Sequence, residues 1–226
     1  MPSFLYTLMH PALYHHGKKP PFFEGWYYKL VSANESIRCA VIPAVILGEQ
    51  GHAFIQIVDG VRGRMEYYSF PLSEFWASKT DFEIRIADNK FTLDGFSLNL
   101  HSDSGQTVTG QVHLHGTRSW PVTLFSPGVM GWYAWVPAME CYHGVLSLDH
   151  TLSGSLTFGD HRVDFSAGRG YLEKELGIDE PRRNRWLQHW TSQALQALEA
   201  HLASERETGR FAHGDAPTLA DICLAS

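Results

Sequence analysis

Several features that would assign this chain to a familiar class are scarce or missing. Only three cysteines are present, Cys39, Cys141 and Cys223, and they are far apart with no CxxC pair. This usage fits a reduced cytosolic protein better than a secreted disulfide scaffold. No apolar run approaches the ~18 residues needed to span a bilayer, and Pro11 interrupts the N-terminal segment before a signal-peptide core develops. We therefore expect a soluble protein in the cytoplasm.

Basic residues are also in the minority. Lys and Arg number 18 against 24 Asp and Glu, which gives a net charge of −6, and no stretch forms a Lys/Arg-rich stripe. Nucleic-acid binding is therefore disfavoured. A Gly-rich phosphate loop and a Ser–His–Asp order are missing too. His113 and His115 share one face of a predicted strand, but a metal needs further convergent ligands and nothing in the spacing demands them, so no metal is expected.

Apolar residues, by contrast, are plentiful and follow two different periods. Hydrophobic residues make up 44% and aromatic residues 13% of the 226 positions, enough for a sizeable core. Before residues 171–177 (YLEKELG) they alternate with polar residues, and from 181 to 202 they recur at three- and four-residue spacing. Period 2 buries one face of a strand, whereas period 3.6 buries one stripe of a helix. The pattern predicts an all-β domain over 1–177 and a helical segment over 178–226.

The predicted strands are short and separated by turn signals. They cover residues 24–31, 37–45, 53–58, 82–86, 96–100, 108–115, 145–150, 152–158 and 162–165. Turn-forming residues at 87–89, 94–95 and 159–160 separate these runs at hairpin-like intervals. Many short antiparallel strands indicate a barrel or sandwich, and closure removes exposed edges. We predict a barrel with a ligand-sized interior, because the aromatic residues are too many for a thin core.

Three segments place a glutamate among aromatic residues. Glu24 lies in PFFEGWYYKL, Glu140 in GVMGWYAWVPAMECYHG and Glu173 in GRGYLEKELG. Burial among rings would raise the pKa of such a carboxyl and keep it protonated as a general acid. A plainer interpretation stays open, because aromatic residues are common in strands and a glutamate beside them can face water or pair with Arg169.

These segments resemble a known family. FFEGWYYKL, GVMGWYAWVPAMECYHGVLSLDH and FSAGRGYLEKELG, in this order, are similar to hallmark segments of the tocopherol cyclase family, and HPALYHHGKKPPFFEGWYYKLV is similar to the start of bacterial members. The resemblance covers roughly residues 8–177. It implies a lipocalin-like antiparallel β-barrel, of the kind shared with carotenoid hydratases, and an isomerase that closes the chromanol ring of tocopherols from a prenylated hydroquinone. It implies no cofactor.

Such a cyclisation protonates the prenyl alkene while the phenolic oxygen adds to the resulting cationic carbon. It needs an acid in a dry pocket, rings that stabilise positive charge and a groove for the isoprenoid. The candidate catalytic residues are Glu24, Glu140 and Glu173 as acids, with His143 and Tyr142 to orient or deprotonate the phenol. The candidate substrate-binding residues are Trp26, Tyr28, Trp132, Trp135, Arg169 and Tyr171.

The resemblance ends where the helical period begins. Family members continue past the GRGYLEKELG-like segment into a second β-rich portion, which this sequence replaces with a helical pattern, so the resemblance implies the first barrel of a two-barrel protein. Asp179 is a plausible helix N-cap with Pro181 in the first turn. One apolar stripe follows, formed by Trp186, Trp190, Ala194, Leu198 and Leu202. Residues 171–224, with GDAPTLADICL, resemble part of the helical domain of zeta-class glutathione transferases, the maleylacetoacetate isomerases, without the residues that bind glutathione.

The two resemblances therefore meet inside residues 171–177. A gene fusion, a recombination product, an assembly error and a designed chimera would each give such a junction. The stripe of the tail predicts docking on the barrel mouth, homodimerisation or partial disorder. Two functions remain beside the cyclase: a non-catalytic barrel that binds a hydrophobic isoprenoid or lipid, and a glutathione transferase-related fragment. The expected partner is a hydrophobic prenylated aromatic molecule, and peripheral membrane contact stays open.

Overall fold

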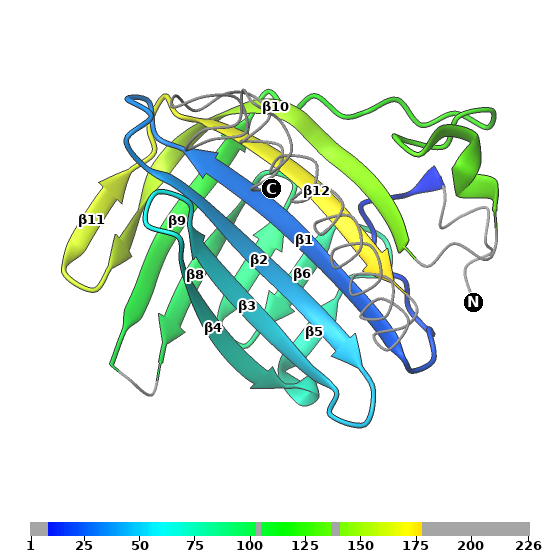
Figure 1. Cartoon of the computed structure of the whole chain (residues 1–226), viewed down its shortest axis with the longest axis horizontal. Coiled ribbons are helices and arrows are strands. Elements are labelled where there is room, and N and C mark those ends of the chain that lie inside the picture. Colours follow the sequence, from blue (N-terminus) through cyan, green and yellow to red (C-terminus); the bar gives the residue numbers. More distant parts are fainter. Residues whose placement is uncertain (1–8, 103–104, 137–140, 178–226) are drawn as a thin grey trace, which may run out of the picture. The chain divides into compact units, whose positions relative to one another are not determined.

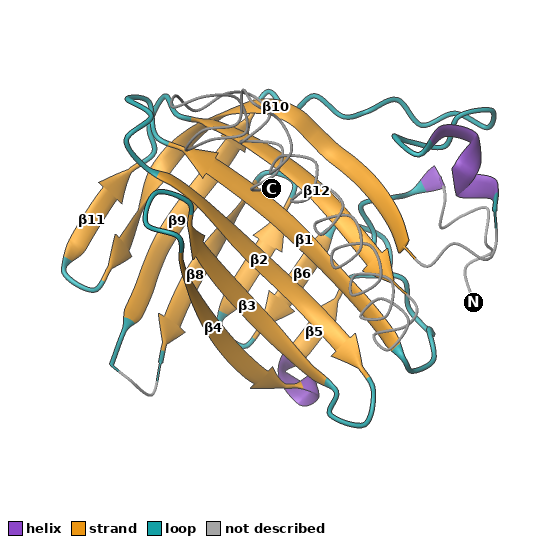
Figure 2. Cartoon of the chain, viewed as in Figure 1, coloured by secondary structure: helices purple, strands orange, loops and turns teal. Residues whose placement is uncertain are grey.

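The computed structural model describes residues 9–102, 105–136 and 141–177. Two predictions lie outside the described residues, namely the helical segment 178–226 and the acid Glu140. The described part is mainly antiparallel β-structure, as the alternation predicted (Figure 1 and Figure 2). Among the described residues, no helix has the length and apolar character needed to cross a membrane.

One 12-stranded sheet contains all the named strands. These are β1 (Phe22–Val31), β2 (Arg38–Leu47), β3 (His52–Asp59), β4 (Arg64–Pro71), β5 (Phe75–Ala77), β6 (Glu83–Ile86), β7 (Asn89–Thr92), β8 (Gly95–His101), β9 (Thr107–His115), β10 (Cys141–Phe158), β11 (His161–Asp164) and β12 (Arg169–Gly177). Their order is β4-β3-β2-β1-β12-β10-β9-β8-β7-β6-β5, with β11 paired to β10. Two short 3-10 helices, η1 (Leu72–Glu74) and η2 (Gly131–Trp135), lie in the connections.

The sheet curls because several of its strands bend. Gly110 in β9 and Gly154 in β10 have φ angles of 135° and 102°, which favour glycine, and a Cβ at either would press on the neighbouring strand's backbone. β10 spans the two predicted strands 145–150 and 152–158 as one strand of 18 residues, with register shifts at Val145/Ser147 and Ser147/His150. β4 and β5, the two ends of the strand order, are joined in the chain through η1.

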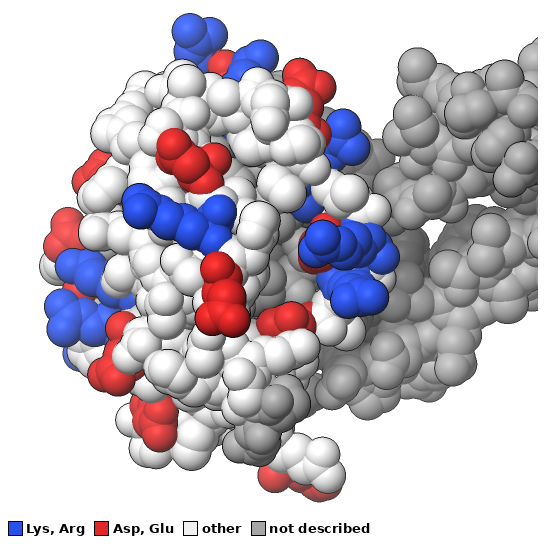
Figure 3. Space-filling model, turned by 90° about the vertical axis from the view of Figure 1, so that its left-hand side faces the viewer, with Lys and Arg blue, Asp and Glu red and all other residues white. Residues whose placement is uncertain are grey.

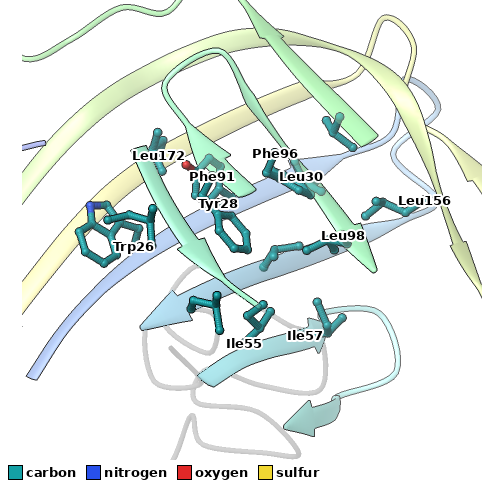
Figure 4. Close-up of a cluster of buried hydrophobic side chains, with 14 of the residues drawn as sticks. Trp26, Tyr28, Leu30, Ile55, Ile57, Phe91, Phe96, Leu98, Leu156 and Leu172 are labelled. Carbon is teal, nitrogen blue, oxygen red and sulfur yellow. The ribbon is translucent and has the colours of Figure 1, made fainter. Parts of the chain in front are cut away.

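Side chains fill the inside of the curled sheet. On β1, Trp26, Tyr28 and Leu30 face inward, on the same side as the rings of Phe91 on β7 and Phe96 on β8 (Figure 4). Phe82, in the loop before β6, also belongs to this cluster. Trp26 stacks on Phe82 with ring centroids 5.8 Å apart, and Tyr28 meets Phe96 edge-on at 5.2 Å. These contacts join the two halves of the sheet directly. The expected ligand-sized space is therefore wrong for the centre of the curled sheet, because the aromatic residues occupy it themselves.

The segment in which the hydrophobic period changes is a central strand. Residues 171–177 belong to β12, which pairs with β1 on one side and β10 on the other. Leu172, Lys174 and Leu176 share its inward face. The β-domain therefore depends on this strand, and the three segments that resemble the tocopherol cyclase family lie on or beside three adjacent strands, β1, β12 and β10.

Charged side chains of the described residues are intermixed on the surface. Over the face in view in Figure 3, basic and acidic residues alternate. On β6 and β7, Glu83 pairs with both Arg85 and Lys90, at 2.6 and 3.1 Å. Such exposed pairs contribute little to stability, on the order of 1 kcal/mol or less each.

Candidate functional site

A buried ion pair lies at one end of the inward face of β1 and β12. Glu24 of β1 is 0% exposed and Lys174 of β12 is 2% exposed. Lys174 is directly opposite Trp26 in the strand register, so its ammonium group reaches diagonally to Glu24, with Nζ 2.5 Å from Oε1. The same nitrogen also donates to the carbonyl oxygen of Leu13 and lies 5.4 Å from the Trp26 ring centre.

His15 completes this cluster from the segment that precedes β1. Its backbone N–H donates to both carboxylate oxygens of Glu24, at 3.2 and 3.1 Å, and its ring Nδ1 lies 2.9 Å from Oε1. The other ring nitrogen, Nε2, is buried and has no hydrogen-bond partner among the residues that the structure describes. Trp26 fixes the same segment through a hydrogen bond from Nε1 to the carbonyl oxygen of Ala12, at 3.2 Å. We call His15, Glu24 and Lys174 the buried triad.

The triad sets its own protonation states. Burial raises the pKa of Glu24, but the Lys174 charge and the hydrogen bonds from His15 and Lys174 outweigh it, so the pKa lies below its ordinary value. Burial lowers the pKa of His15, which favours the neutral ring despite the bond to Glu24. Burial also lowers the pKa of Lys174, against the opposing effect of Glu24.

The sequence-based expectation for Glu24 is therefore wrong in one respect. We expected burial among rings to keep this carboxyl protonated, but its aromatic neighbours are accompanied by an ammonium group and two N–H donors. Three donors to one carboxyl favour the ionised form. Glu24 is thus held as a carboxylate and serves as an acceptor in the described structure.

A pocket opens beside the buried triad. Its lining comes from the N-terminal segment, the loop around η2, the start of β10 and the end of β12, namely Pro11, His15, Lys18, Pro127, Met130, Ala134, Tyr142, His143, Gly144, Lys174 and Leu176. The cavity volume is about 60 Å³. Since a water molecule needs roughly 10–15 Å³ on this measure, the pocket has room for a polar head group, and a longer substrate would extend past its mouth.

A second polar cluster lies on the outer face of β12. Glu173 adjoins Lys174 in sequence, so its side chain projects from the opposite face. His143 Nε2 lies 3.0 Å from Glu173 Oε2, and the Tyr171 hydroxyl donates to the same oxygen. Burial raises the pKa of Glu173, but these two bonds outweigh it and leave the pKa below its ordinary value. The expected protonated acid is again wrong, and the partner of Glu173 is His143 rather than Arg169.

The other predicted site residues are dispersed. Tyr142 and His143 line the pocket, and the Tyr142 hydroxyl donates to the carbonyl oxygen of Val136 at 2.7 Å. Tyr28 lies in the packed interior, where its hydroxyl donates to the carbonyl oxygen of Thr92. Arg169 forms an exposed ion pair with Asp149, with Nη2 2.7 Å from Oδ1.

Two of the candidate substrate-binding residues are tryptophans in η2. Trp132 is 62% exposed and stacks on Tyr133, and Trp135 is 36% exposed. Neither lines the pocket, although Met130 and Ala134 in the same loop do. Their proposed role in binding a substrate stays a prediction.

The described residues contain no group of three or more His, Cys, Asp or Glu side chains that could hold a metal ion. His113 and His115 on β9 have ring centroids 6.4 Å apart, and His115 Nε2 contacts Ser153 Oγ at 2.7 Å. These exposed histidines therefore form a stacked surface pair, in which His115 is hydrogen-bonded to Ser153.

Sequence reasoning missed His15 and Lys174. A signal for Lys174 existed in YLEKELG, where strand alternation places it between Leu172 and Leu176 on one face. A lysine flanked in this way is buried and requires a counter-charge. No comparable pattern marks His15, because it lies in an irregular segment.

Comparison with known proteins gives partial similarities. No protein-family model matches the chain. Maleylpyruvate isomerase of a Ralstonia species is 46% identical over 54 residues, which is 24% of this chain and 26% of that protein. Maleylacetoacetate isomerase of Rhizobium meliloti is 44% identical over 48 residues, 21% of this chain and 22% of that protein. The chain thus spans about a quarter of the length of these curated relatives.

Similarity to solved structures is distant. CghA, solved with Sch210972, has a TM-score of 0.40 and 13% identity, with 70% of this chain and 46% of that chain covered. Kievitone hydratase from Nectria haematococca has a TM-score of 0.37 and 8% identity, over 70% and 48%. An AttH from Nitrosomonas europaea has a TM-score of 0.37 and 11% identity, over 72% and 56%.

Proposed function

We propose that this protein is a tocopherol cyclase-like isomerase that closes an oxygen-containing ring on a prenylated hydroquinone. One observation carries the proposal. The three family-like segments, which are far apart in sequence, come together at one pocket. β12 supplies Lys174 to the lining, and β10 with the preceding loop supplies Tyr142, His143 and Met130. β1 supplies Glu24, which pairs with Lys174 behind the lining. A pocket with an apolar wall and a few convergent polar groups suits a small aromatic head group.

The proposed reaction is an isomerisation with balanced protons. The phenolic O–H bond breaks and a C–O bond forms, while the alkene carbon that is not attacked gains a proton. Glu24 and Glu173 both have pKa values below the ordinary range, which makes them poor proton donors at rest. Glu140, which directly precedes β10 in sequence, is therefore the preferred acid of the original candidates. Tyr142 and His143 remain proposed as groups that orient the phenol.

The test is turnover under anaerobic conditions. The full chain is incubated with a prenylated benzoquinol, and chromanol formation is followed by liquid chromatography with mass spectrometry. Because general acid catalysis contributes about 10²–10⁴-fold, Glu140→Gln should lower the rate by at least about 100-fold. The exposed Glu49→Gln is the matched control and should be unaffected. Chromanol formation at the parental rate in Glu140→Gln would remove Glu140 as the acid.

A second candidate is a non-catalytic protein that binds a hydrophobic isoprenoid or lipid. The apolar part of the pocket lining, which includes Pro11, Pro127, Met130 and Leu176, favours apolar ligands whether or not a proton is transferred. Native extraction followed by mass spectrometry separates the two functions. A bound isoprenoid without chromanol formation supports the binding protein, whereas chromanol formation supports the enzyme.

A further inference from the structure

We infer that His15 is the hydroxyl-recognising residue of the pocket, and that it selects ligands which present a neutral O–H donor, such as a phenol or hydroquinone, over those that present a carbonyl. The choice of a hydroquinone as the ligand rests on the proposed function. The hydrogen-bond selectivity rests on the buried triad alone. No sequence signal and no comparison assigns a role to this histidine.

The position of the proton on the His15 ring follows from the contacts of Glu24. Oε1 of Glu24 accepts from Lys174 Nζ at 2.5 Å, and the backbone N–H of His15 donates to both oxygens. A carboxylate held in this way can only accept. Nδ1 of His15 lies 2.9 Å from Oε1 and 3.1 Å from Lys174 Nζ. Both nitrogens contact the same carboxylate oxygen, and the shorter distance from Nδ1 is to that oxygen, so we assign a hydrogen to Nδ1, which donates it to Oε1.

The other ring nitrogen is consequently a hydrogen-bond acceptor. In a neutral imidazole with its proton on Nδ1, Nε2 carries a lone pair. This atom is buried and has no partner among the described residues, and the His15 side chain is only 5% exposed. A buried polar atom without a partner carries a free-energy cost. Since His15 lines the pocket, a donor that enters there would remove this cost.

The neighbouring lysine does not offset this selectivity. Lys174 Nζ donates to Glu24 Oε1 and to the Leu13 carbonyl oxygen, and the side chain is 2% exposed. Its hydrogen bonds are therefore directed into the protein. A quinone carbonyl at Nε2 would place two acceptors together, while a hydroquinone O–H would form the missing bond. The arrangement predicts preference for the reduced form of a quinone–hydroquinone pair.

The variant His15→Asn separates recognition from structure. An asparagine amide can place an N–H donor near the position of Nδ1 and retain the bond to Glu24, but it has no group at the position of Nε2. Anaerobic titration calorimetry would use a prenylated benzoquinol, its dimethyl ether and the matching quinone. The unmodified protein should bind the benzoquinol at least 10-fold tighter than the other two. His15→Asn should lose at least 10-fold affinity for the benzoquinol and leave ether binding unchanged.

The exposed His113→Asn is the matched control and should bind all three compounds as the parent does. Equal affinity for benzoquinol and ether in the parent protein, or equal losses for both in His15→Asn, would overturn the inference. Absence of binding by all three compounds would overturn it as well. Selective binding without chromanol formation would refute the cyclase proposal and support the role of His15. Chromanol formation with equal affinity for benzoquinol and ether would support the cyclase proposal and refute the role of His15.

Discussion

At the scale of single residues, the Lys174–Glu24 pair is the most consequential interaction in the described structure. Both side chains are almost fully buried, so each depends on the other to offset the loss of water. Breaking a buried pair by removing one partner costs about 3–5 kcal/mol, because a charge is left without compensation. The site is therefore also a determinant of stability.

We predict that Lys174→Met lowers the free energy of unfolding by about 3–5 kcal/mol at pH 7. Without Lys174, the main cause that lowers the pKa of Glu24 is gone and burial raises it above the unfolded value. The folded variant then binds a proton more readily than its unfolded chain, so its stability relative to the parent improves as the pH falls from 7 to 5. Urea unfolding of both proteins at pH 7 and pH 5 measures the difference in their free energies of unfolding, which should be smaller at pH 5.

Lys90→Met is the control for this experiment, because the Lys90–Glu83 pair is exposed and should contribute about 1 kcal/mol or less. If the difference in free energy of unfolding between the parent and Lys174→Met is the same or larger at pH 5 than at pH 7, the protonation states assigned to the triad are contradicted.

At the residue scale, the sequence left two interpretations of Glu24 open, burial among rings or exposure to water. The structure shows the buried one, but with the carboxyl ionised instead of protonated. Its ionisation depends on residues 15 and 174, which are distant in sequence, so composition around Glu24 could not reveal it. Tyr142 and His143 line the pocket, whereas Tyr28 lies in the core. The sequence could not separate these cases, because alternation does not distinguish a pocket wall from a packed interior.

At the scale of elements, β12 combines structural and functional roles. Its inward face carries Lys174 between two buried leucines, and its outward face carries Glu173. At its start, Gly170 lies opposite the buried His150 of β10. A Cβ at residue 170 would lie 2.2 Å from His150 Nε2, so a side chain there would have to displace the buried His150 ring.

We predict that Gly170→Ala lowers the free energy of unfolding by about 1–3 kcal/mol, as expected for overpacking in a closely packed site. Gly48→Ala is the matched control, since a Cβ there meets nothing within 4 Å. Thermal unfolding followed by circular dichroism measures both variants. Equal melting temperatures for Gly170→Ala and the parent would show that β10 and β12 are less tightly packed here than described.

Elements were predictable where alternation was strong. The nine predicted strands all overlap observed strands, but β4, β5, β7 and β12 were not predicted. β5 and β7 have only 3 and 4 residues, too few to show a period. In β12, the run LEKEL is rich in charged residues and compatible with a helix. Its extended conformation depends on pairing with β1 and β10.

At the scale of the whole described domain, the packed interior and the pocket are separate features. Tyr28, Phe91 and Phe96 fill the inside of the curled sheet, whereas the pocket lies beside the triad and is lined in part by the loop that contains Met130. A large antiparallel sheet was predictable from strand number and spacing. A filled interior was not, because aromatic content alone does not say whether rings line a space or occupy it.

We predict that substitutions in the pocket change ligand affinity but not stability, and that substitutions in the packed interior change stability but not affinity. Met130→Trp should reduce benzoquinol affinity by at least 10-fold, because the larger ring fills a pocket of about 60 Å³, and should leave stability nearly unchanged. Phe91→Leu should lower the free energy of unfolding by roughly 1–3 kcal/mol through a cavity in the core, with affinity retained. Calorimetric titration and urea unfolding of both variants test this. Loss of affinity in Phe91→Leu alone would place the ligand in the centre instead.

The bond between Lys174 and the Leu13 carbonyl joins residues 161 positions apart. Contacts of such high sequence separation form late, since the loop they close must first be ordered. At typical synthesis rates, roughly 10–30 s separate the emergence of the two residues from the ribosome. Throughout this interval Glu24 has no counter-ion, and the strand that carries it has no neighbour on the β12 side. The final pairing step therefore closes the sheet and creates the recognition site in a single event, so that incompletely made chains have neither.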